Sequence, residues 1–379
     1  MPAYYDCNAT TPMEPEVLEI VLHYLRDEYG NAGSRTHEFG QVAARAVQVA
    51  RSEIAEGVGA DASEVVFTSG ATEANNLAIL GLASYATQQG RRHIVTTLIE
   101  HKAVLEPIEQ LEKRGFEITR IAPEASGEIS ADRLLAAVRP DTVLVSIMHA
   151  NNETGVLQPI EEVAQGLANH STYLHVDAAQ SYGKDDLMLQ HHRIDMISVS
   201  GHKLFAPQGV GALIARRRDF ARPPLTPLMW GGGQERTLRP GTLPVPLIAG
   251  FGAAARIARR DAAARLEKVN AIRKQILTAF TGIGARFAGG QARRTLPHVL
   301  NAYFEGVNSE ALMLSLKNIV AVSNGSACTA NSYLPSHVLT HMGLNREWID
   351  GAIRLSWSHL SEEVNWAEVC TIIQSLRGT

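Results

Sequence analysis

From about residue 60 to residue 216, short apolar and β-branched runs alternate with stretches that repeat apolar positions at helical spacing. Strands that alternate with helices indicate a mostly parallel sheet covered by helices on both faces. The nearly continuous apolar run at residues 143–145 is typical of a strand buried on both faces. The pattern predicts an α/β protein. Its expected strands are residues 65–68, 94–97, 117–121, 142–148, 173–176, 196–199 and 210–215, with helices at 73–85 and 102–113.

The second part of the chain has a different pattern, which begins with one long expected helix at residues 246–280, rich in Ala, Arg and Ile. After it, strands alternate with helices in a shorter unit, which predicts a smaller α+β domain. The strands are expected at residues 298–303, 319–323 and 353–357, and the helices at 309–316, 335–342 and 362–376. We expect residues 13–250 to form the large domain, and residues 251–379 together with 1–12 to form the small one.

Composition and charge are those of an ordinary globular protein. Of 379 residues, 45% are apolar, and 35 Lys and Arg against 39 Asp and Glu give a net charge of −4. This charge provides no long-range attraction to nucleic acid or to an acidic membrane, so we expect no direct binding to either. No segment approaches the ~20 apolar residues that span a bilayer. The N-terminal residues also lack the basic and then apolar pattern of a signal peptide.

The three cysteines, Cys7, Cys328 and Cys370, are too few and too scattered for a disulfide framework or a metal site. We therefore expect no bound metal, and a reducing cytoplasm as the location. Cys370 lies in an apolar helical pattern and is expected in the core. Cys328 lies in a loop of small polar residues and is a candidate for chemistry. Cys7 is expected to be structural.

Ligands of open α/β sheets bind beyond the carboxyl ends of the strands, where this chain has several polar residues. Residues 69–75 (Ser-Gly-Ala-Thr-Glu-Ala-Asn) open a helix, so their amides and the Thr72 hydroxyl could hold a phosphate. An ordinary capped strand–turn–helix is the alternative. Asp177 follows another strand, and Lys203 lies in a tight turn of small residues. A lysine, a carboxylate and phosphate-binding amides are the parts that bind pyridoxal 5′-phosphate (PLP).

At these positions the sequence resembles the class V, fold-type-I PLP enzymes, and in particular the NifS/IscS-like cysteine desulfurases of the first group. Each matching motif is weak alone, but together they are specific and cover nearly the whole chain. The resemblance implies a fold-type-I PLP-dependent transferase whose small domain carries the catalytic-cysteine loop. The matching segments are residues 9–12, 68–72, 151–155 (Asn-Asn-Glu-Thr-Gly), 175–180, 200–203, 231–236 (Gly-Gly-Gly-Gln-Glu-Arg), 241–242 and 325–329 (Gly-Ser-Ala-Cys-Thr).

The resemblance implies a role for each matching residue. Lys203 would hold the cofactor through its amine, His101 would stack on the ring and move protons, and Cys328 would receive the sulfur as a persulfide. The other implied ligands are Ala71, Thr72, Ser200 and His202 for the phosphate, Asp177 for the pyridinium nitrogen, Gln180 for the phenolate oxygen, and Asn152 and Arg354 for the substrate carboxylate. Thr242 would reach the phosphate of the neighbouring subunit, which implies a homodimer.

The implied reaction converts L-cysteine to L-alanine and passes the sulfur to an acceptor protein. Selenocysteine lyase or another class V reaction, such as an aminotransferase, is the alternative among enzymes. A non-catalytic sulfur-relay or scaffold protein is the alternative outside them. The acceptor pathway stays open between iron–sulfur cluster assembly, nitrogenase maturation, tRNA thiolation and DNA phosphorothioation. The chain departs from the family pattern at several positions, among them Thr237, where glycine is common.

Overall fold

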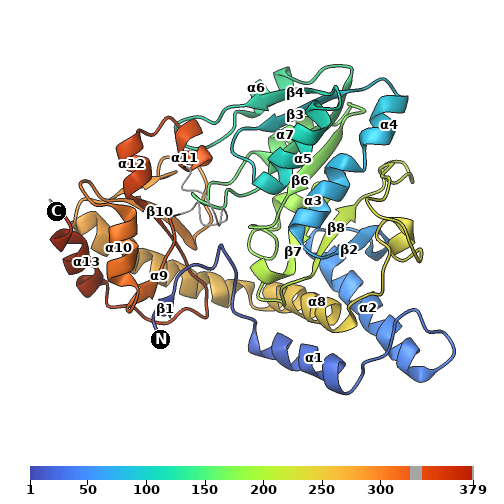
Figure 1. Ribbon diagram of the computed structural model, residues 1–379, viewed down its shortest axis with the longest axis horizontal. Helices are drawn as coiled ribbons and strands as arrows, with labels where there is room; N and C mark the ends of the chain where they lie inside the picture. The colour runs from blue at the N-terminus through green and yellow to red at the C-terminus, as the bar shows by residue number, and fades with distance from the viewer. Residues whose placement is uncertain (325–334, 378–379) are drawn as a thin grey trace.

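The computed structural model describes residues 1–324 and 335–377. A seven-stranded sheet lies at the centre of the larger part of the molecule (Figure 1). β8 runs antiparallel to both of its neighbours, and all other neighbouring strands are parallel. The predicted α/β class with a mostly parallel sheet is therefore confirmed. The strand order is β2 (Val65–Thr68), β8 (Gly211–Ala215), β7 (Met196–Ser200), β6 (Tyr173–Asp177), β5 (Thr142–Met148), β3 (His93–Thr97) and β4 (Glu117–Ile121).

Helices cover both faces of this sheet, and alternate strand residues pack against each layer. In β2, Val65 and Phe67 belong to the core beneath α2 (Glu38–Gly57) and α8 (Val245–Arg260). Val66 belongs to the core on the opposite face. The helices of that second layer are α3 (Ala71–Leu80), α4 (Ala83–Gln88) and α5 (Lys102–Glu112), and the first layer also holds α1 (Pro15–Arg26), α6 (Ala131–Ala136) and α7 (Ile160–Gly166). Burial from both sides explains why every residue of β5 is apolar or hydrogen-bonded inside the sheet.

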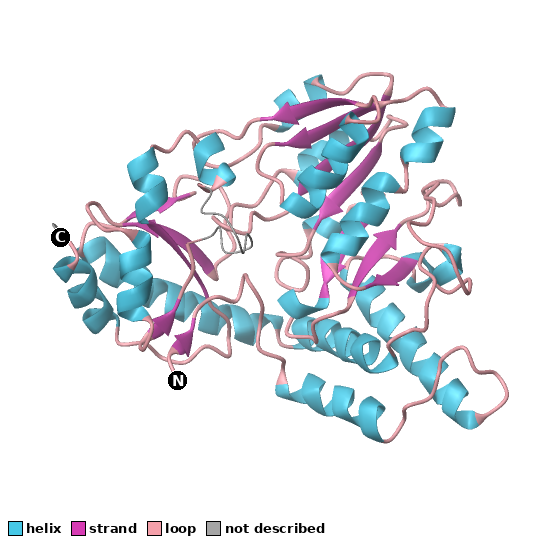
Figure 2. Ribbon diagram, viewed as in Figure 1, coloured by secondary structure: helices cyan, strands magenta, loops and turns pink. Residues whose placement is uncertain are grey.

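The smaller part of the molecule has its own apolar core and a three-stranded antiparallel sheet (Figure 2). Its sheet order is β12 (Ala352–Ser356), β10 (Val299–Tyr303) and β9 (Arg286–Ala288). The helices around it are α9 (Ala262–Gly282), α10 (Ser309–Leu316), α12 (Arg346–Gly351) and α13 (Trp366–Ser375). The buried residues of α11 (His337–His341), Val338 and Leu339, pack instead in the core of the larger part. The first strand of the chain, β1 (Ala3–Tyr4), pairs in parallel with β11 (Val320–Ala321), so the N-terminus belongs to this part.

The long helix predicted at residues 246–280 is wrong as one element, because α8 and α9 are separated at Asp261 (φ −104°, ψ 9°). α8 packs closely on α2, where a Cβ on Gly252 would lie 2.4 Å from Ala50 Cα. The buried residues of α9 instead pack in the smaller core. The segment thus passes from the larger core to the smaller core near Asp261. The domain boundary expected between residues 250 and 251 stays a prediction.

Two further differences concern the larger part. The helix predicted at residues 73–85 is interrupted at Gly81, where the Gly81 carbonyl accepts hydrogen bonds from the Thr226 amide at 2.9 Å and its hydroxyl at 3.0 Å. A Cβ on Gly81 would lie 2.2 Å from the Leu77 carbonyl oxygen and 3.2 Å from the Thr226 carbonyl oxygen, so the backbone here leaves no room for a side chain. α1, α2, α6 and α7 were not predicted at all. Among the described residues, no helix has both the length and the apolar character needed to cross a membrane.

Candidate active site

A cavity of about 480 Å³ lies where the parallel strands of the large sheet end. Segments that follow β2, β3, β5, β6 and β7 line it, because parallel strands direct their carboxyl ends to one edge. β8 runs the opposite way, so residues before it, Gln208 and Gly209, line the same cavity. Asn8, Ala9 and Arg354 complete the wall from the smaller part of the molecule.

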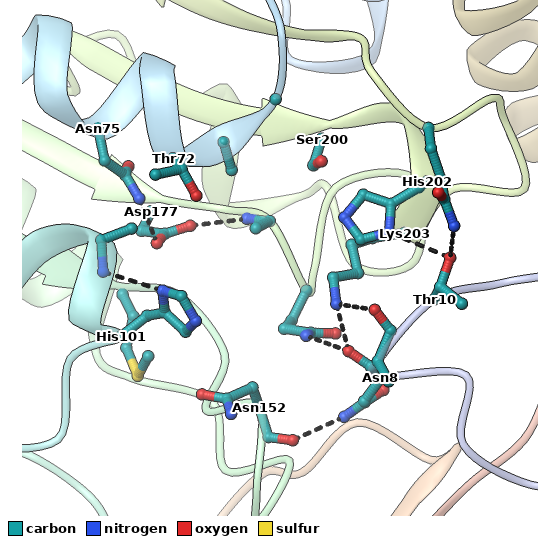
Figure 3. Close-up of a pocket in the computed structure, with 18 of the residues that line it drawn as sticks. Asn8, Thr10, Thr72, Asn75, His101, Asn152, Asp177, Ser200, His202 and Lys203 are labelled. Atoms are coloured by element: carbon teal, nitrogen blue, oxygen red, sulfur yellow. Dashed lines mark hydrogen bonds between the residues drawn. The ribbon is translucent and has the colours of Figure 1, made fainter. Parts of the chain in front are cut away.

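One end of the cavity is formed by the N-terminus of α3, which begins at Ala71. The first amides of a helix have no partner within the helix, and they point toward a bound anion. The cradle depends on close packing, since a Cβ on Gly211 would lie 2.6 Å from Gly70 Cα. Thr72 and Ser200 add hydroxyl groups at this end (Figure 3). We call residues 69–72 the cradle.

His202 closes the same end of the cavity, where its Nδ1 lies 3.2 Å from the Thr10 hydroxyl oxygen. Burial, with the Lys203 and Lys184 ammonium groups, lowers the pKa of His202 to about 4. The imidazole is therefore neutral at neutral pH. It presents a polar but uncharged ring to the anion end of the cavity.

Asp177 ends β6 and is 6% exposed. Its carboxylate accepts hydrogen bonds from Asn75 Nδ2 at 2.8 Å and from the Ala179 amide at 3.0 Å. A second carboxyl lies nearby on Glu100, and burial raises its pKa to about 8, with a contribution from the Asp177 charge. Glu100 is therefore protonated at neutral pH. Asp177 is left as the carboxylate that lines the cavity.

Lys203 enters the cavity from the turn after β7 (Figure 3). Its Nζ donates to the carbonyl of Asn8 and, at 2.6 Å, to the carbonyl of Ala9. Gln180 Nε2 also donates to the Asn8 carbonyl at 3.1 Å, and Gln180 Oε1 is buried without a protein partner. Thr11 fixes this N-terminal segment by donating its hydroxyl to the His202 carbonyl at 2.9 Å. The segment thus positions the lysine and the glutamine together.

The other end of the cavity carries Arg354, which is 2% exposed on β12. Its Nη2 donates to Asp6 Oδ1 at 2.7 Å and its Nη1 donates to the Asn152 carbonyl at 3.1 Å. Asn8 Nδ2 donates to the same Asn152 carbonyl at 2.9 Å. The guanidinium is therefore held in one orientation, and its Nε is buried without a protein partner. Asn152 follows Asn151, whose side-chain oxygen accepts hydrogen bonds from the backbone amides of Glu153 and Thr154 in the same turn.

His101 lies between these ends, at the N-terminus of α5 (Figure 3). Its Nδ1 accepts the Ala103 amide at 3.0 Å, which fixes the orientation of the ring as a helix cap. Glu153 is buried close by, and Ser336 donates to its carboxyl at 2.5 Å. Burial raises the pKa of Glu153 to about 7, against the opposing charges of Arg354 and His101. This acid therefore titrates near neutral pH.

Most of the residues that the sequence singled out converge on this cavity. Those that line it are Ala71, Thr72, His101, Asn152, Asp177, Gln180, Ser200, His202, Lys203 and Arg354. Thr242 is exposed and does not line it, so its role toward a neighbouring subunit stays a prediction. Cys328 lies outside the described residues. Cys370 packs in the smaller core as predicted, and burial raises the pKa of the Cys7 thiol to about 11.

Three residues of the site lie outside the segments that the sequence had marked, namely Asp6, Asn8 and Gln208. Asp6 and Asn8 precede the marked segment 9–12, and Gln208 follows the marked segment 200–203. Thr10 and Asn75 lie within marked segments but had been given no role of their own. Asn75 lies one helical turn after Ala71, a spacing that brings both to the same side of α3. Among the described residues, no group of three or more His, Cys, Asp and Glu could hold a metal ion.

Comparison with known proteins identifies relatives over the whole chain. A cysteine desulfurase IscS from Pectobacterium carotovorum is 45% identical over 365 residues, which cover 96% of this chain and 89% of the relative. The crystal structure of DndA from Streptomyces lividans superposes with a TM-score of 0.82 at 50% identity, covering 92% of this chain and 98% of that one. SspA in complex with cysteine has a TM-score of 0.82 at 38% identity, covering 93% and 98%.

The family model for aminotransferase class-V matches residues 3–365 of this chain. Enzymes of this family use PLP, and the similarity to solved structures supports the predicted fold-type-I architecture. The match includes the N-terminal segment, all the strands of the large sheet and β12, which together surround the cavity. The chain belongs to the aminotransferase class-V family.

Proposed function

We propose that this protein is a PLP-dependent cysteine desulfurase that converts L-cysteine to L-alanine and passes the sulfur to an acceptor protein. One observation carries the proposal. A helix N-terminus suited to a phosphate, a carboxylate at Asp177 and an amine at Lys203 line one cavity at the carboxyl edge of the sheet. The relatives named IscS cysteine desulfurase, and the SspA structure with cysteine, support this choice of substrate.

The residues of the cavity fit PLP by their chemistry. Asp177 is a buried hydrogen-bonded carboxylate that would keep a pyridinium nitrogen protonated, and Gln180 would face the phenolate oxygen. The cradle, Ser200 and His202 would bind the phosphate, and the Lys203 amine would hold the cofactor covalently. When bound, PLP supplies an electron sink next to the α-carbon of the substrate.

The protein's own residues would orient the substrate and move its sulfur. Arg354 and Asn152 would bind the substrate carboxylate, and His101 would transfer protons beside the cofactor ring. The Cys328 thiolate would attack the substrate sulfur. A new S–S bond forms, the carbon–sulfur bond breaks, and its electron pair returns to the substrate carbon, which takes up a proton to become alanine. Cys328 would then carry the persulfide to an acceptor.

We propose a homodimer in which Thr242 reaches the phosphate site of the neighbouring subunit, and a cytoplasmic location where thiols stay reduced. The net charge of −4 favours a protein acceptor over direct nucleic-acid binding. Similarity to both IscS and DndA keeps iron–sulfur cluster assembly and DNA phosphorothioation as the pathways to test first. Persulfide labelling of proteins that co-purify from the native host would identify the acceptor.

The decisive test is turnover of L-cysteine by the purified protein. We expect a yellow protein that forms equal amounts of alanine and sulfide with a reductant present. Cys328→Ala should keep the colour and lose desulfuration, whereas Lys203→Ala should lose covalent attachment of PLP. Full turnover by Cys328→Ala would contradict the proposal. Turnover of selenocysteine alone, a keto-acid product, or a colourless protein that binds a scaffold partner would favour the alternatives.

A further inference from the structure

The loop at residues 231–241 holds three consecutive non-glycine residues in the left-handed conformation. Glu235, Arg236 and Thr237 have φ angles of 46°, 58° and 69°. This conformation is disfavoured for L-residues because Cβ approaches the following carbonyl oxygen. Such a run persists only where surrounding contacts hold it, and its presence is a reason to look for a functional role.

The contacts that hold this loop are made to the free edge of β2. β2 pairs only with β8, so its other edge has unpaired backbone groups. The Val65 carbonyl accepts hydrogen bonds from Arg51 Nη1 at 2.6 Å and from Arg236 Nη1 at 3.1 Å. The Phe67 amide donates a hydrogen bond to Glu235 Oε2 at 2.7 Å. Side chains of the loop and of α2 thus take the place of an eighth strand.

Glu235 is the centre of this arrangement. One carboxylate oxygen accepts a hydrogen bond from Arg51 Nη2 at 2.6 Å, and the other accepts one from Arg51 Nη1 at 2.8 Å. The Arg51 side chain is 7% exposed and the Glu235 side chain is 2% exposed. A bidentate pair fixes orientation as well as distance. Breaking a buried pair of this kind leaves an uncompensated charge, so the loop depends strongly on it.

A second tie joins the same loop to the cradle itself. Arg239 Nε donates to Glu73 Oε1 at 2.9 Å, in the first turn of α3. The other oxygen of Glu73 accepts the Ser69 amide at 2.7 Å. The loop therefore contacts β2 just before the cradle and α3 just after it.

We propose that residues 231–241 form a brace for the cradle, with Glu235 and Arg239 as positioning residues that strengthen cofactor binding without touching the cofactor. The inference rests on the proposed PLP function. The anion-binding amides of residues 70–72 must be aligned before the phosphate arrives, and the brace holds the backbone on both sides of them. Neither Glu235 nor Arg239 lines the cavity.

Thr237 makes the brace of this chain particularly dependent on its ion pair. Glycine adopts a positive φ without a clash. Thr237 is a β-branched residue at φ 69°, for which this conformation is a genuine outlier. The Arg51–Glu235 pair therefore has to hold a more strained loop here than a glycine would require.

Equilibrium dialysis of the full chain against PLP tests the proposal. Glu235→Gln should weaken PLP binding about tenfold, on the scale of one lost charge-assisted hydrogen bond. The double variant Glu235→Gln, Thr237→Gly should bind PLP about fivefold more tightly than Glu235→Gln alone, because one left-handed non-glycine residue is removed. Thr237→Ala, which keeps a Cβ but is not β-branched, is the matched control and should recover much less than glycine. Equal PLP affinity of Glu235→Gln and wild type, or equal recovery by glycine and alanine, would overturn the proposal.

Glu235 is buried, so a second variant guards against a folding defect. Arg239→Gln removes only the tie to Glu73 and should weaken PLP binding about fivefold, as expected for a partly exposed charged contact. Arg120→Gln breaks the pair with Glu112, in which the arginine is about as exposed as Arg239 and the glutamate is more exposed than Glu73, and it should leave PLP binding unchanged. Equal PLP affinity of these two variants would refute the brace. A wild-type chain that bound no PLP would instead refute the proposed function.

Discussion

Replacement of Arg354 by lysine should raise the KM for L-cysteine much more than it lowers kcat. The guanidinium already donates to Asp6 at 2.7 Å and to the Asn152 carbonyl at 3.1 Å, and its remaining N–H groups can form a fork around a carboxylate. A single ammonium group cannot keep both protein contacts and also supply two parallel bonds to the substrate. The substrate should lose one charge-assisted hydrogen bond.

The size of the expected rise in KM follows from the loss of this one hydrogen bond. A hydrogen bond to a charged group contributes about 1.5–3 kcal/mol. Since 1.4 kcal/mol corresponds to a factor of ten, KM should rise roughly 10- to 140-fold. The assay is alanine formation with a reductant over a range of L-cysteine concentrations, with thermal unfolding measured in parallel.

Arg273→Lys is the matched control for Arg354→Lys. Arg273 is partly buried, and it donates to the carbonyls of Pro297 and Val299 away from the cavity. This variant should lower Tm without changing KM. A KM for Arg354→Lys within twofold of wild type, or a fall in kcat alone, would refute the carboxylate-binding role of Arg354.

Three further outcomes are expected. Gly211→Ala should destabilise the fold by about 1–3 kcal/mol and weaken PLP binding, because its Cβ would lie 2.6 Å from Gly70 Cα; unchanged Tm and PLP affinity would contradict this. Burial lowers the pKa of His149 to about 4 and that of His175 to about 3, from 6.5. The unfolded chain therefore binds more protons between about pH 6.5 and pH 4, so the free energy of unfolding should fall as pH falls through that window. Urea denaturation at several pH values measures this, and His149→Leu should show a shallower fall. Finally, Cys7 should resist alkylation of the native protein at pH 8 because burial raises its pKa to about 11, and Cys7→Ala should retain desulfuration; mass spectrometry and the alanine assay check both.

The strands of the large sheet were predictable because each is a short run of mainly apolar and β-branched residues. Residues 142–148 are apolar or β-branched except for Ser146, whose hydroxyl is hydrogen-bonded to His175, as burial on both faces requires. α2 was missed because its buried face consists largely of alanines and one arginine, which form a weak apolar stripe in the sequence. The interruption at Gly81 depends on Thr226, which lies far along the chain and leaves no local trace.

The candidate site was predictable where polar residues follow strands, as with Asp177 and Lys203, because sheet topology brings strand ends together. Asn8 and Asp6 were beyond such reasoning. They reach the cavity only because the N-terminal segment crosses from the smaller part of the molecule, which no local pattern encodes. The strained loop at residues 231–241 is visible in the sequence as a motif, but its backbone angles depend on contacts with β2.

The pairing of β1 with β11 affects when the site can form during synthesis. Ala3 aligns with Val320, and the Cys7 amide donates to the Ser356 carbonyl, so this segment finds its partners in parts of the chain that are translated much later. At about 5–20 residues per second, the N-terminal segment waits roughly 15–65 s for those partners. Lys203 and Gln180 lack their contacts with Asn8 until then. Cofactor loading should therefore follow the synthesis of β11 and β12.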